Sequence, residues 1–165
     1  MSILDILQWP DERLTRACEP VTREDMRAVV QDMFDTMYAA NGRGLAGPQV
    51  GIMERLFVMD CTWKEGEKTP VTFINPSIIA VEHQYVEMEE ACLSIPGLSI
   101  PISRPVAVTV QWQSETGEFH MNDFDGFEAR CIQHEMDHLN GRITLDHLPA
   151  DERAAHEAAY KGHTQ

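Results

Sequence analysis

The sequence has few basic residues and no long apolar run. Only 13 lysines and arginines stand against 27 aspartates and glutamates, which gives a formal net charge of −14 at pH 7. Nucleic acids and anionic membrane surfaces attract positive potential, so this charge argues against either as the main partner. No stretch approaches the ~18 apolar residues of a membrane span, and the first residues lack the basic start and apolar stretch of a signal peptide. We therefore expect a soluble, cytoplasmic protein, and a monomer.

Cysteines are also scarce. The four that are present are scattered rather than paired at the spacing of a disulfide framework: Cys18, Cys61, Cys92 and Cys131. In a reducing compartment such cysteines are buried thiols, metal ligands or catalytic groups. A small buried hydrophobic side chain is the default interpretation for each of them. Only Cys92 lies in a context that favours another role.

Length and composition predict one domain. The 165 residues are close to the common domain size of ~100–150 residues. With 43% of residues hydrophobic, the chain can build a core without disulfides. No internal repeat or low-complexity tract divides it. We therefore expect a single domain over residues 1–165, with a short polar tail from about residue 149.

Hydrophobic periodicity predicts a long helix over residues 22–41. Thr22 and Asp25 resemble a capping box at its start, and Asn41-Gly42 is a typical stop. The apolar residues between them follow the i, i+3, i+4, i+7 spacing of a buried helix face. These residues are Met26, Val29, Val30, Met33, Phe34, Met37 and Tyr38.

Short apolar runs bounded by turn formers predict strands in the middle of the chain. Such runs cover residues 56–59, 71–74 and 78–81. Over residues 106–112 apolar side chains alternate with small or polar ones, as a half-buried strand requires. Residues 115–118 then indicate a hairpin turn.

Residues 125–141 are predicted to form a second helix, which carries the clearest chemical motif. The order of helix, strands and helix predicts an α+β fold. Residues 134–138 read His-Glu-Met-Asp-His, an HExxH motif. Residues four apart share one helix face, so the two imidazoles can bind one metal ion. Glu135 lies next to His134, where it can take a proton from metal-bound water without being a ligand.

A catalytic metal with three protein ligands needs one further donor, and the position of that donor separates the reaction classes. The metzincin pattern requires histidine at position 144, which is Thr144, so that class is excluded. A thermolysin-like site would use a downstream glutamate, for which Glu157 is the only well-spaced candidate. Cys92, at the end of a predicted strand, fits better as a thiolate ligand. Cys131 is a rival on the helix face of the motif, and we interpret it as lining the site.

Three segments carry motifs in a characteristic order. Residues 42–49 read GRGLAGPQ, residues 90–94 read EACLS, and residues 133–139 read QHEMDHL. In sequence and in order, these segments resemble the glycine-rich, cysteine and metal-binding motifs of the peptide deformylase family. Residues 10–14 and 73–76 are also similar to family segments, so the resemblance runs to about position 148.

This resemblance implies a compact α+β fold with antiparallel β-sheets packed around the central helix that carries the HExxH motif. It implies hydrolysis of the N-formyl group from the formyl-methionine of nascent peptides, with release of formate. The implied metal ligands are Cys92, His134 and His138, with water in the fourth position. The implied cofactor is one divalent ion, Fe²⁺ as the native metal and Zn²⁺ or Ni²⁺ as alternatives.

The resemblance also implies roles for residues around the metal. Gln49 and the backbone N–H of Leu93 would bind the formyl oxygen, and Glu135 would transfer the proton. The formylated peptide, or nascent-chain N-terminus, would pair with residues 42–44 as an added strand. The implied substrate-binding residues are Gly42, Arg43, Gly44, Ala91, Phe127, Arg130 and Cys131.

Three residues depart from the family pattern. Arg43 replaces a small apolar residue between two glycines, Gly47 replaces alanine, and Ala91 replaces glycine. The methyl group of Ala91 would crowd the backbone or disturb a special dihedral, and Arg43 would narrow the pocket or recruit an acidic group. These changes favour an alternative function: an amidase retuned to another N-formyl or N-acyl substrate, or one weakly active on formyl-Met peptides. A purely structural metal site is disfavoured, because it needs no carboxylate such as Glu135 beside the metal.

Several other charged residues have less defined expected roles. Residues 151–165 are not basic, so we do not expect ribosome docking through the tail. Arg104 would either pair with Glu90 and hold the cysteine loop, or remain exposed. The other histidines have no evident partner spacing and are expected to be solvated: His83, His120, His147, His156 and His163.

Overall fold

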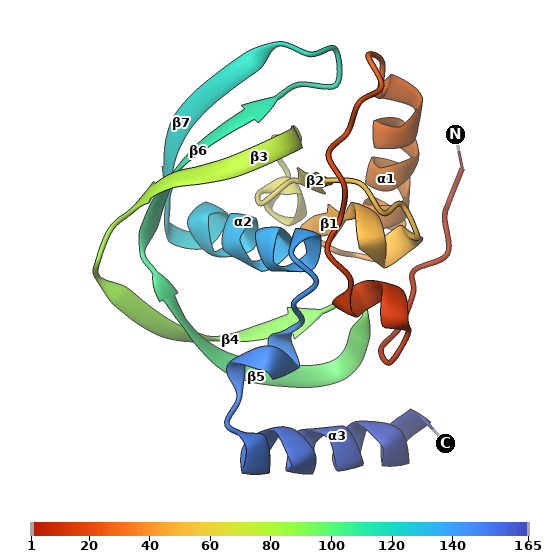
Figure 1. Ribbon diagram of the computed structural model, residues 1–165, viewed down its shortest axis with the longest axis vertical. Coiled ribbons are helices and arrows are strands. Elements are labelled where there is room, and N and C mark those ends of the chain that lie inside the picture. The colour runs from red at the N-terminus through yellow and green to blue at the C-terminus, as the bar shows by residue number, and fades with distance from the viewer. Residues whose placement is uncertain (1, 165) are drawn as a thin grey trace.

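Helix α2 lies between two antiparallel β-layers (Figure 1). The computed structural model describes residues 2–164. The larger layer has the strand order β1-β2-β3-β6-β7, and each neighbouring pair is antiparallel. Its strands are β1 (Gly44–Ala46), β2 (Leu56–Met59), β3 (Val71–Val81), β6 (Ala107–Gln113) and β7 (Phe119–Asp125).

The smaller layer is a hairpin of β4 (Tyr85–Cys92) and β5 (Ile95–Pro105), which lies across α2 from the larger layer (Figure 1). Of this hairpin, the sequence predicted only a strand ending at Cys92. Strand β5 was missed because its sequence contains three prolines and a glycine, although alternate side chains over residues 100–104 are buried. Proline and glycine within a run argue against a strand in a sequence.

Strand β3 is a single strand where two were predicted. Residues 71–74 and 78–81 both belong to it and are joined through Asn75 and Pro76. Asn75 has a φ of +48°, and the register between β3 and β6 shifts at this point. Such a bulge lets a proline, which has no N–H to donate, remain within a sheet.

Strand β6 confirms the predicted alternation. Val108, Val110 and Trp112 are buried, while Gln111 between them is exposed. The predicted turn connects β6 to β7, and Gly117 adopts a φ of +92° there. That conformation is open to glycine without steric penalty.

Helix α1 (Arg27–Ala39) begins later than predicted. The capping box expected at Thr22 does not form; instead, the Asp25 carboxylate accepts a hydrogen bond from the backbone N–H of Arg27. Val21 exchanges two hydrogen bonds with the side chain of Asn75, which ties this segment to β3 rather than to a helix. The predicted apolar face is present, with Met26, Val30, Met33 and Met37 buried.

Helix α2 (Gly126–Leu139) packs one face against the aromatic residues of the larger layer. Burial of each large apolar side chain stabilises the fold by ~1.5–3 kcal/mol, so this face fixes the helix in place. The predicted stop is present, since Gly141 has a φ of +75°. This core contains Phe57, Phe73, Phe124, Ala129, Ile132, Met136 and Leu139.

The segment expected to be a solvated polar tail is helix α3 (Ala150–Thr164), which lies beside β5 (Figure 1). Tyr160 is only 4% exposed, and its hydroxyl donates to the backbone oxygen of Trp9. One buried aromatic among alanines and charges is too little periodicity to reveal the packing from sequence. Within residues 2–164, no helix is long and apolar enough to cross a membrane.

Candidate active site

The HExxH motif occupies the middle of α2 and faces the end of β4. His134 and His138 lie one turn apart, with ring centroids separated by 5.1 Å. Cys92, the last residue of β4, faces them, and its Sγ lies 3.4 Å from Nε2 of His138. One potential ligand atom from each of the three residues lies within 4.8 Å of the others. The structure therefore brings together the three side chains singled out as metal ligands.

The two rival ligands lie elsewhere. Cys131 points its Sγ toward the backbone oxygen of Arg43, at 3.9 Å. The thiol of Cys61, together with burial, raises the pKa of Cys131 well above its ordinary value, so Cys131 remains protonated. Glu157 lies on α3 and accepts a hydrogen bond from Arg153 at 2.7 Å. Neither belongs to the cluster of potential ligands found among the described residues.

The imidazoles near Cys92 favour the thiolate form of its side chain. Burial alone raises the pKa of the Cys92 thiol, but the imidazoles of His138 and His134 outweigh it and bring the pKa well below its ordinary value. The thiolate is the form of cysteine that binds metals. One thiolate and two imidazoles are a donor set suited to a first-row divalent metal with one position left open.

A buried carboxylate orients one of the two histidines. Oε1 of Glu90 lies 2.9 Å from Nδ1 of His134, which leaves the other ring nitrogen for the cluster. Arg104 donates to both oxygens of this carboxylate, at 2.6 and 2.9 Å, and Arg130 also donates to it. Burial raises the pKa of Glu90, but His134 and Arg104 overcome this effect and lower it to about 2. Glu90 is therefore ionised, as a group that orients a candidate metal-binding histidine needs to be.

Arg104 is the buried partner of Glu90 rather than an exposed charge. It is 5% exposed, and its Nη1 also donates to Asp137, a residue inside the HExxH motif. Nε2 of His147 lies 2.8 Å from the same Asp137 carboxylate. His147, which was expected to be solvated, is therefore part of a network behind α2. The sequence did not indicate this pairing, because Asp137 reads as an ordinary surface position of the motif.

Glu135 is buried beside the cluster without being part of it. It is 3% exposed, and its Oε1 has no hydrogen-bond partner among residues 2–164. Burial raises the pKa of Glu135 above its ordinary value, against the opposing effect of His134 and His138. A buried carboxylate with a free oxygen and a raised pKa is suited to accept a proton and return it.

Gln49 points its amide group at the cysteine. It is 1% exposed, and its Nε2 lies 3.6 Å from Sγ of Cys92 and 3.1 Å from Oγ of Ser94. Its Oε1 accepts the backbone N–H of Ala46, which fixes which end of the amide faces the site. Leu93, the other residue implied to bind the formyl oxygen, follows Cys92 directly and lines the same cavity.

A cavity of about 490 Å³ opens in front of these groups. It is bounded by the segment before β1, the end of β4 and the first turns of α2, and it reaches Cys92, His134 and Glu135. Lys64 and Met88 also line it, and neither was predicted. All seven residues implied to bind substrate line it as well: Gly42, Arg43, Gly44, Ala91, Phe127, Arg130 and Cys131.

The lining residues differ in what they can offer a ligand. The guanidinium of Arg130 is occupied, because it donates to Glu90 and to the backbone oxygens of Val86 and Ile102. Arg130 thus forms part of the cavity wall, but its charge is neutralised by Glu90 and is not available to a ligand. Ala91 is exposed and does not have a positive φ, so the crowding and the special dihedral expected there are not found.

The other two departures from the family pattern, Gly47 and Arg43, are explained by their surroundings. A Cβ at Gly47 would lie 2.6 Å from the backbone oxygen of Ile52 and 2.9 Å from that of Glu54, so this chain requires glycine there. Arg43 reaches across the mouth of the cavity: its guanidinium lies 5.3 Å from the ring centroid of Phe127, and its Nη2 lies 2.9 Å from Oε1 of Glu65.

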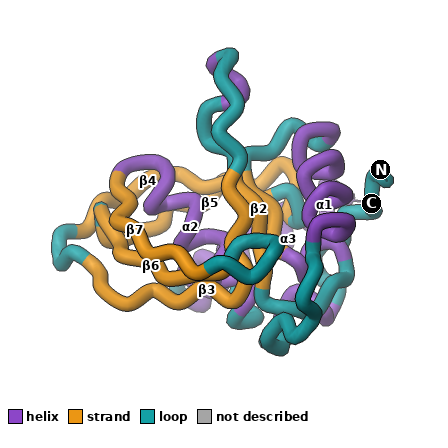
Figure 2. The backbone as a smooth tube through the Cα atoms, turned by 90° about the horizontal axis from the view of Figure 1, so that it is seen from above, coloured by secondary structure: helices purple, strands orange, loops and turns teal. Residues whose placement is uncertain are grey.

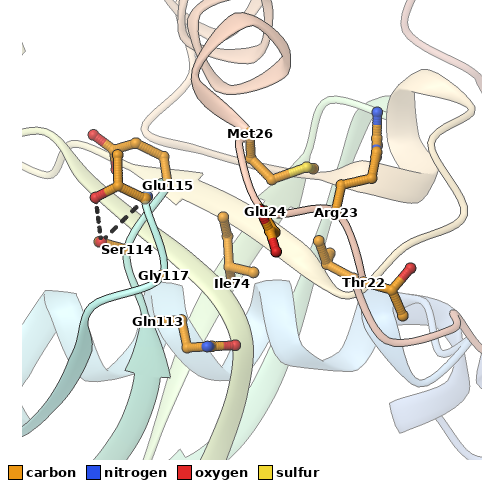
Figure 3. A pocket seen from close by; sticks show the side chains of 11 residues that line it. Thr22, Arg23, Glu24, Met26, Ile74, Gln113, Ser114, Glu115 and Gly117 are labelled. Atoms are coloured by element: carbon orange, nitrogen blue, oxygen red, sulfur yellow. Dashed lines mark hydrogen bonds between the residues drawn. The ribbon is translucent and has the colours of Figure 1, made fainter.

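A second cavity, of about 380 Å³, lies between residues 21–26 and the turn after β6 (Figure 3). Arg23, one of its charged residues, is already paired with Glu54, and among the described residues its lining contains no cysteine or histidine. This cavity therefore lacks the thiol and imidazole groups that the first cavity brings together.

Comparison with known proteins gives a consistent assignment. The family model described as polypeptide deformylase matches residues 3–154. A peptide deformylase of Afipia carboxidovorans is 46% identical over 150 residues, which cover 90% of this chain and 88% of that protein. A peptide deformylase of Saccharophagus degradans is 42% identical and covers 90% of this chain and 86% of its own length.

Solved structures agree in fold. The crystal structure of a peptide deformylase from Ehrlichia chaffeensis matches with a TM-score of 0.91 at 36% identity, over 99% of this chain and 98% of that chain. A structure from the same organism in complex with actinonin matches with a TM-score of 0.90 at 40% identity, over 98% of each chain. These matches confirm the α+β fold predicted from the sequence. The chain therefore belongs to the peptide deformylase family, metal-dependent hydrolases that remove the N-formyl group from nascent peptides.

Proposed function

We propose that Cys92, His134 and His138 hold the single divalent metal of this deformylase, with Fe²⁺ as the native ion and Zn²⁺ or Ni²⁺ able to replace it. The observation that carries the proposal is the convergence of the three ligand atoms within 4.8 Å, beside a carboxylate with an unpartnered oxygen. An ion held there polarises the formyl carbonyl and lowers the pKa of a water molecule toward neutrality.

The proton transfers belong to Glu135 in this proposal. Its unpartnered Oε1 accepts the proton of the attacking water, and its raised pKa favours holding that proton during the step. The same oxygen then delivers the proton to the amine nitrogen as the C–N bond breaks. Formate and a free N-terminus leave the site.

The developing negative charge on the formyl oxygen is stabilised by two donors. Nε2 of Gln49 already points at Cys92, and its orientation is fixed by the hydrogen bond between its Oε1 and Ala46. The backbone N–H of Leu93 is the second donor. A fixed donor of this kind contributes ~3–4 kcal/mol, because it requires no reorganisation when the charge appears.

The substrate is a formylated peptide or the N-terminus of a nascent chain, bound as an added strand. Strand β1 is at the edge of the larger layer, and residues 42–44 line the cavity. Asp60 donates its N–H to the oxygen of Arg43, so the peptide groups of Arg43 face β2. Successive residues of a strand alternate in direction, so the N–H and C=O of Gly44 face the free edge and can bind the peptide.

Arg43 favours a second candidate, an amidase acting on another N-formyl or N-acyl substrate. The discriminating experiment uses anaerobically purified, metal-analysed protein and two peptides, formyl-Met-Ala-Ser and acetyl-Met-Ala-Ser. Formate release from the first, without hydrolysis of the second, is the expected result. Hydrolysis of the acetyl peptide alone would replace deformylation by the second function. A fully metallated protein that hydrolyses neither would contradict deformylation of formyl-Met peptides and the N-acetyl form of the second function.

A further inference from the structure

One charged group at the cavity, Arg43, is only partly paired. Its side chain is 30% exposed, and its ion-pair partner among residues 2–164, Glu65, lies on the segment that follows β2. Figure 2 shows this segment projecting from the body of the molecule. The side chain of Glu65 is 64% exposed, so water and other ions can reach the pair. Exposed pairs of this kind are weak, and their partners exchange readily.

In some other arginines of this chain, both Nε and Nη2 donate hydrogen bonds to a single carboxylate. Arg13 donates to Asp11 through both Nε and Nη2, and Arg104 donates to Glu90 through the same two nitrogens. These nitrogens form the planar fork that matches a carboxylate. Arg43 uses only Nη2 of its fork. Its Nε is buried and has no hydrogen-bond partner among residues 2–164.

A half-occupied fork at a cavity mouth is suited to a carboxylate from outside. A buried N–H without an acceptor is unfavourable, so Arg43 gains if its side chain shifts from Glu65 to a position in which one carboxylate accepts from both Nε and Nη2, instead of from Nη2 alone. Lys64 lines the same cavity and adds a second positive charge. Neutral ligands such as an amide side chain lack the charge that would compete with Glu65.

The direction of the bound peptide identifies the residue that would meet Arg43. The formylated end lies near Cys92 and Gln49, and the peptide then runs antiparallel to β1, toward Arg43. A Cβ on Gly44 would point at Glu135 and Cys131, so the first side chain of the peptide lies on that inner side. Side chains alternate along a strand, so the second lies on the side of Arg43.

We propose that Arg43 is a specificity-determining residue that selects an acidic side chain at the position after the formylated residue, by exchanging Glu65 for the substrate carboxylate. This inference rests on the proposed function. Its observations are the incompletely paired Nε/Nη2 fork, the exposed partner and the position of Arg43 on the substrate edge.

The test compares two peptides of nearly equal shape, formyl-Met-Glu-Ala and formyl-Met-Gln-Ala, with metal-analysed protein. We expect kcat/KM to favour the Glu peptide by ~5-fold or more, mainly through KM, and the ratio to fall at high salt. In Arg43→Gln the ratio should fall to about one. A purely structural role for Arg43 would lower both values together and leave the ratio unchanged.

Glu65→Gln provides the converse change. It removes the competing carboxylate, so the ratio of the Glu peptide to the Gln peptide should rise by ~2-fold or more. Glu67→Gln, on the same projecting segment, is the matched control and should leave the ratio as it is. Formate release with a ratio near one, or a ratio that survives in Arg43→Gln, would overturn this inference alone. No formate from either peptide would instead overturn the proposed function, and the inference with it.

Discussion

Gly44 and Glu135 are in direct contact: a Cβ on Gly44 would lie 2.5 Å from Oε2 of Glu135 and 2.8 Å from Sγ of Cys131. Strand β1 and helix α2 therefore meet at a point where a hydrogen atom fits and a methyl group does not. This contact holds one oxygen of Glu135 against the strand, while the other, Oε1, stays without a partner among residues 2–164.

The first prediction concerns this contact. Gly44→Ala should displace the Glu135 carboxylate and lower kcat/KM for formyl-Met-Ala-Ser by ~10²-fold, the usual scale of general acid–base catalysis. Metal content, measured by elemental analysis, should remain at one ion per chain, because the three proposed ligands are elsewhere. Activity within ~3-fold of the unaltered protein would mean that the position of Glu135 does not depend on Gly44.

The second prediction tests Glu135 as a proton carrier. In Glu135→Gln the side chain keeps its shape but cannot accept a proton, so kcat should fall by at least ~10²-fold. The metal should stay bound, since Glu135 lies outside the ligand cluster. Loss of the metal in this variant would show that Glu135 is a ligand and that the proposed division of roles is incorrect.

The third prediction separates the cysteines. Cys92→Ala removes the thiolate and should reduce metal content to near zero after dialysis against a chelator. Cys131→Ala is the matched control, because this second buried thiol lies on the same helix but outside the cluster, and it should retain the metal. If Cys92→Ala kept its ion and Cys131→Ala lost it, the ligand assignment would be reversed.

The fourth prediction concerns the buried charge network. Arg104→Met leaves Glu90 and Asp137 short of a partner in a buried setting, so the free energy of unfolding should fall by ~3 kcal/mol or more. The control is Arg16→Met, which breaks an exposed pair with Glu12 and should change stability by less than ~0.5 kcal/mol. Urea denaturation of both variants measures the difference, and equal effects would contradict the importance of burial here.

The fifth prediction is a pH dependence of stability. Burial raises the pKa of Asp60, but hydrogen bonds from Tyr38 and from the backbone N–H groups of Thr69 and Thr62 outweigh it, so the pKa lies below its ordinary value. Asp60 therefore stabilises the fold at neutral pH, and this contribution is lost as the pH falls from the pKa of the unfolded chain through that of the folded protein.

Asp60→Asn should remove this contribution. The variant should be less stable than the unaltered protein at pH 7, and the difference should shrink as the pH is lowered. Unfolding by urea at a series of pH values between 7 and about 3 measures it. A difference that stayed constant over this range would show that ionisation of Asp60 does not contribute.

The sequence alone was sufficient to predict the helices and strands in which buried side chains recur at a regular spacing. The HExxH spacing places two imidazoles on one face of any helix that contains it, and α2 was predicted close to its observed bounds. Strand β6 was predicted for a similar reason, because its alternating valines face the core. The resemblance of three ordered motifs then sufficed to indicate the family, and in the structure residues of all three motifs line one cavity.

Tertiary structure decided the features that depend on residues far apart in the chain. Strand β5 and helix α3 lack a clear pattern of their own and are held by partners elsewhere, as Tyr160 is by Trp9. Arg104 and Glu90 are 14 residues apart, and the sequence left open whether Arg104 pairs with Glu90 or stays exposed, until the fold buries the two together. A sequence shows which side chains carry charge, but only packing removes water from around them. Once water is excluded, a charged side chain is held in one position by its hydrogen-bond and ion-pair partners.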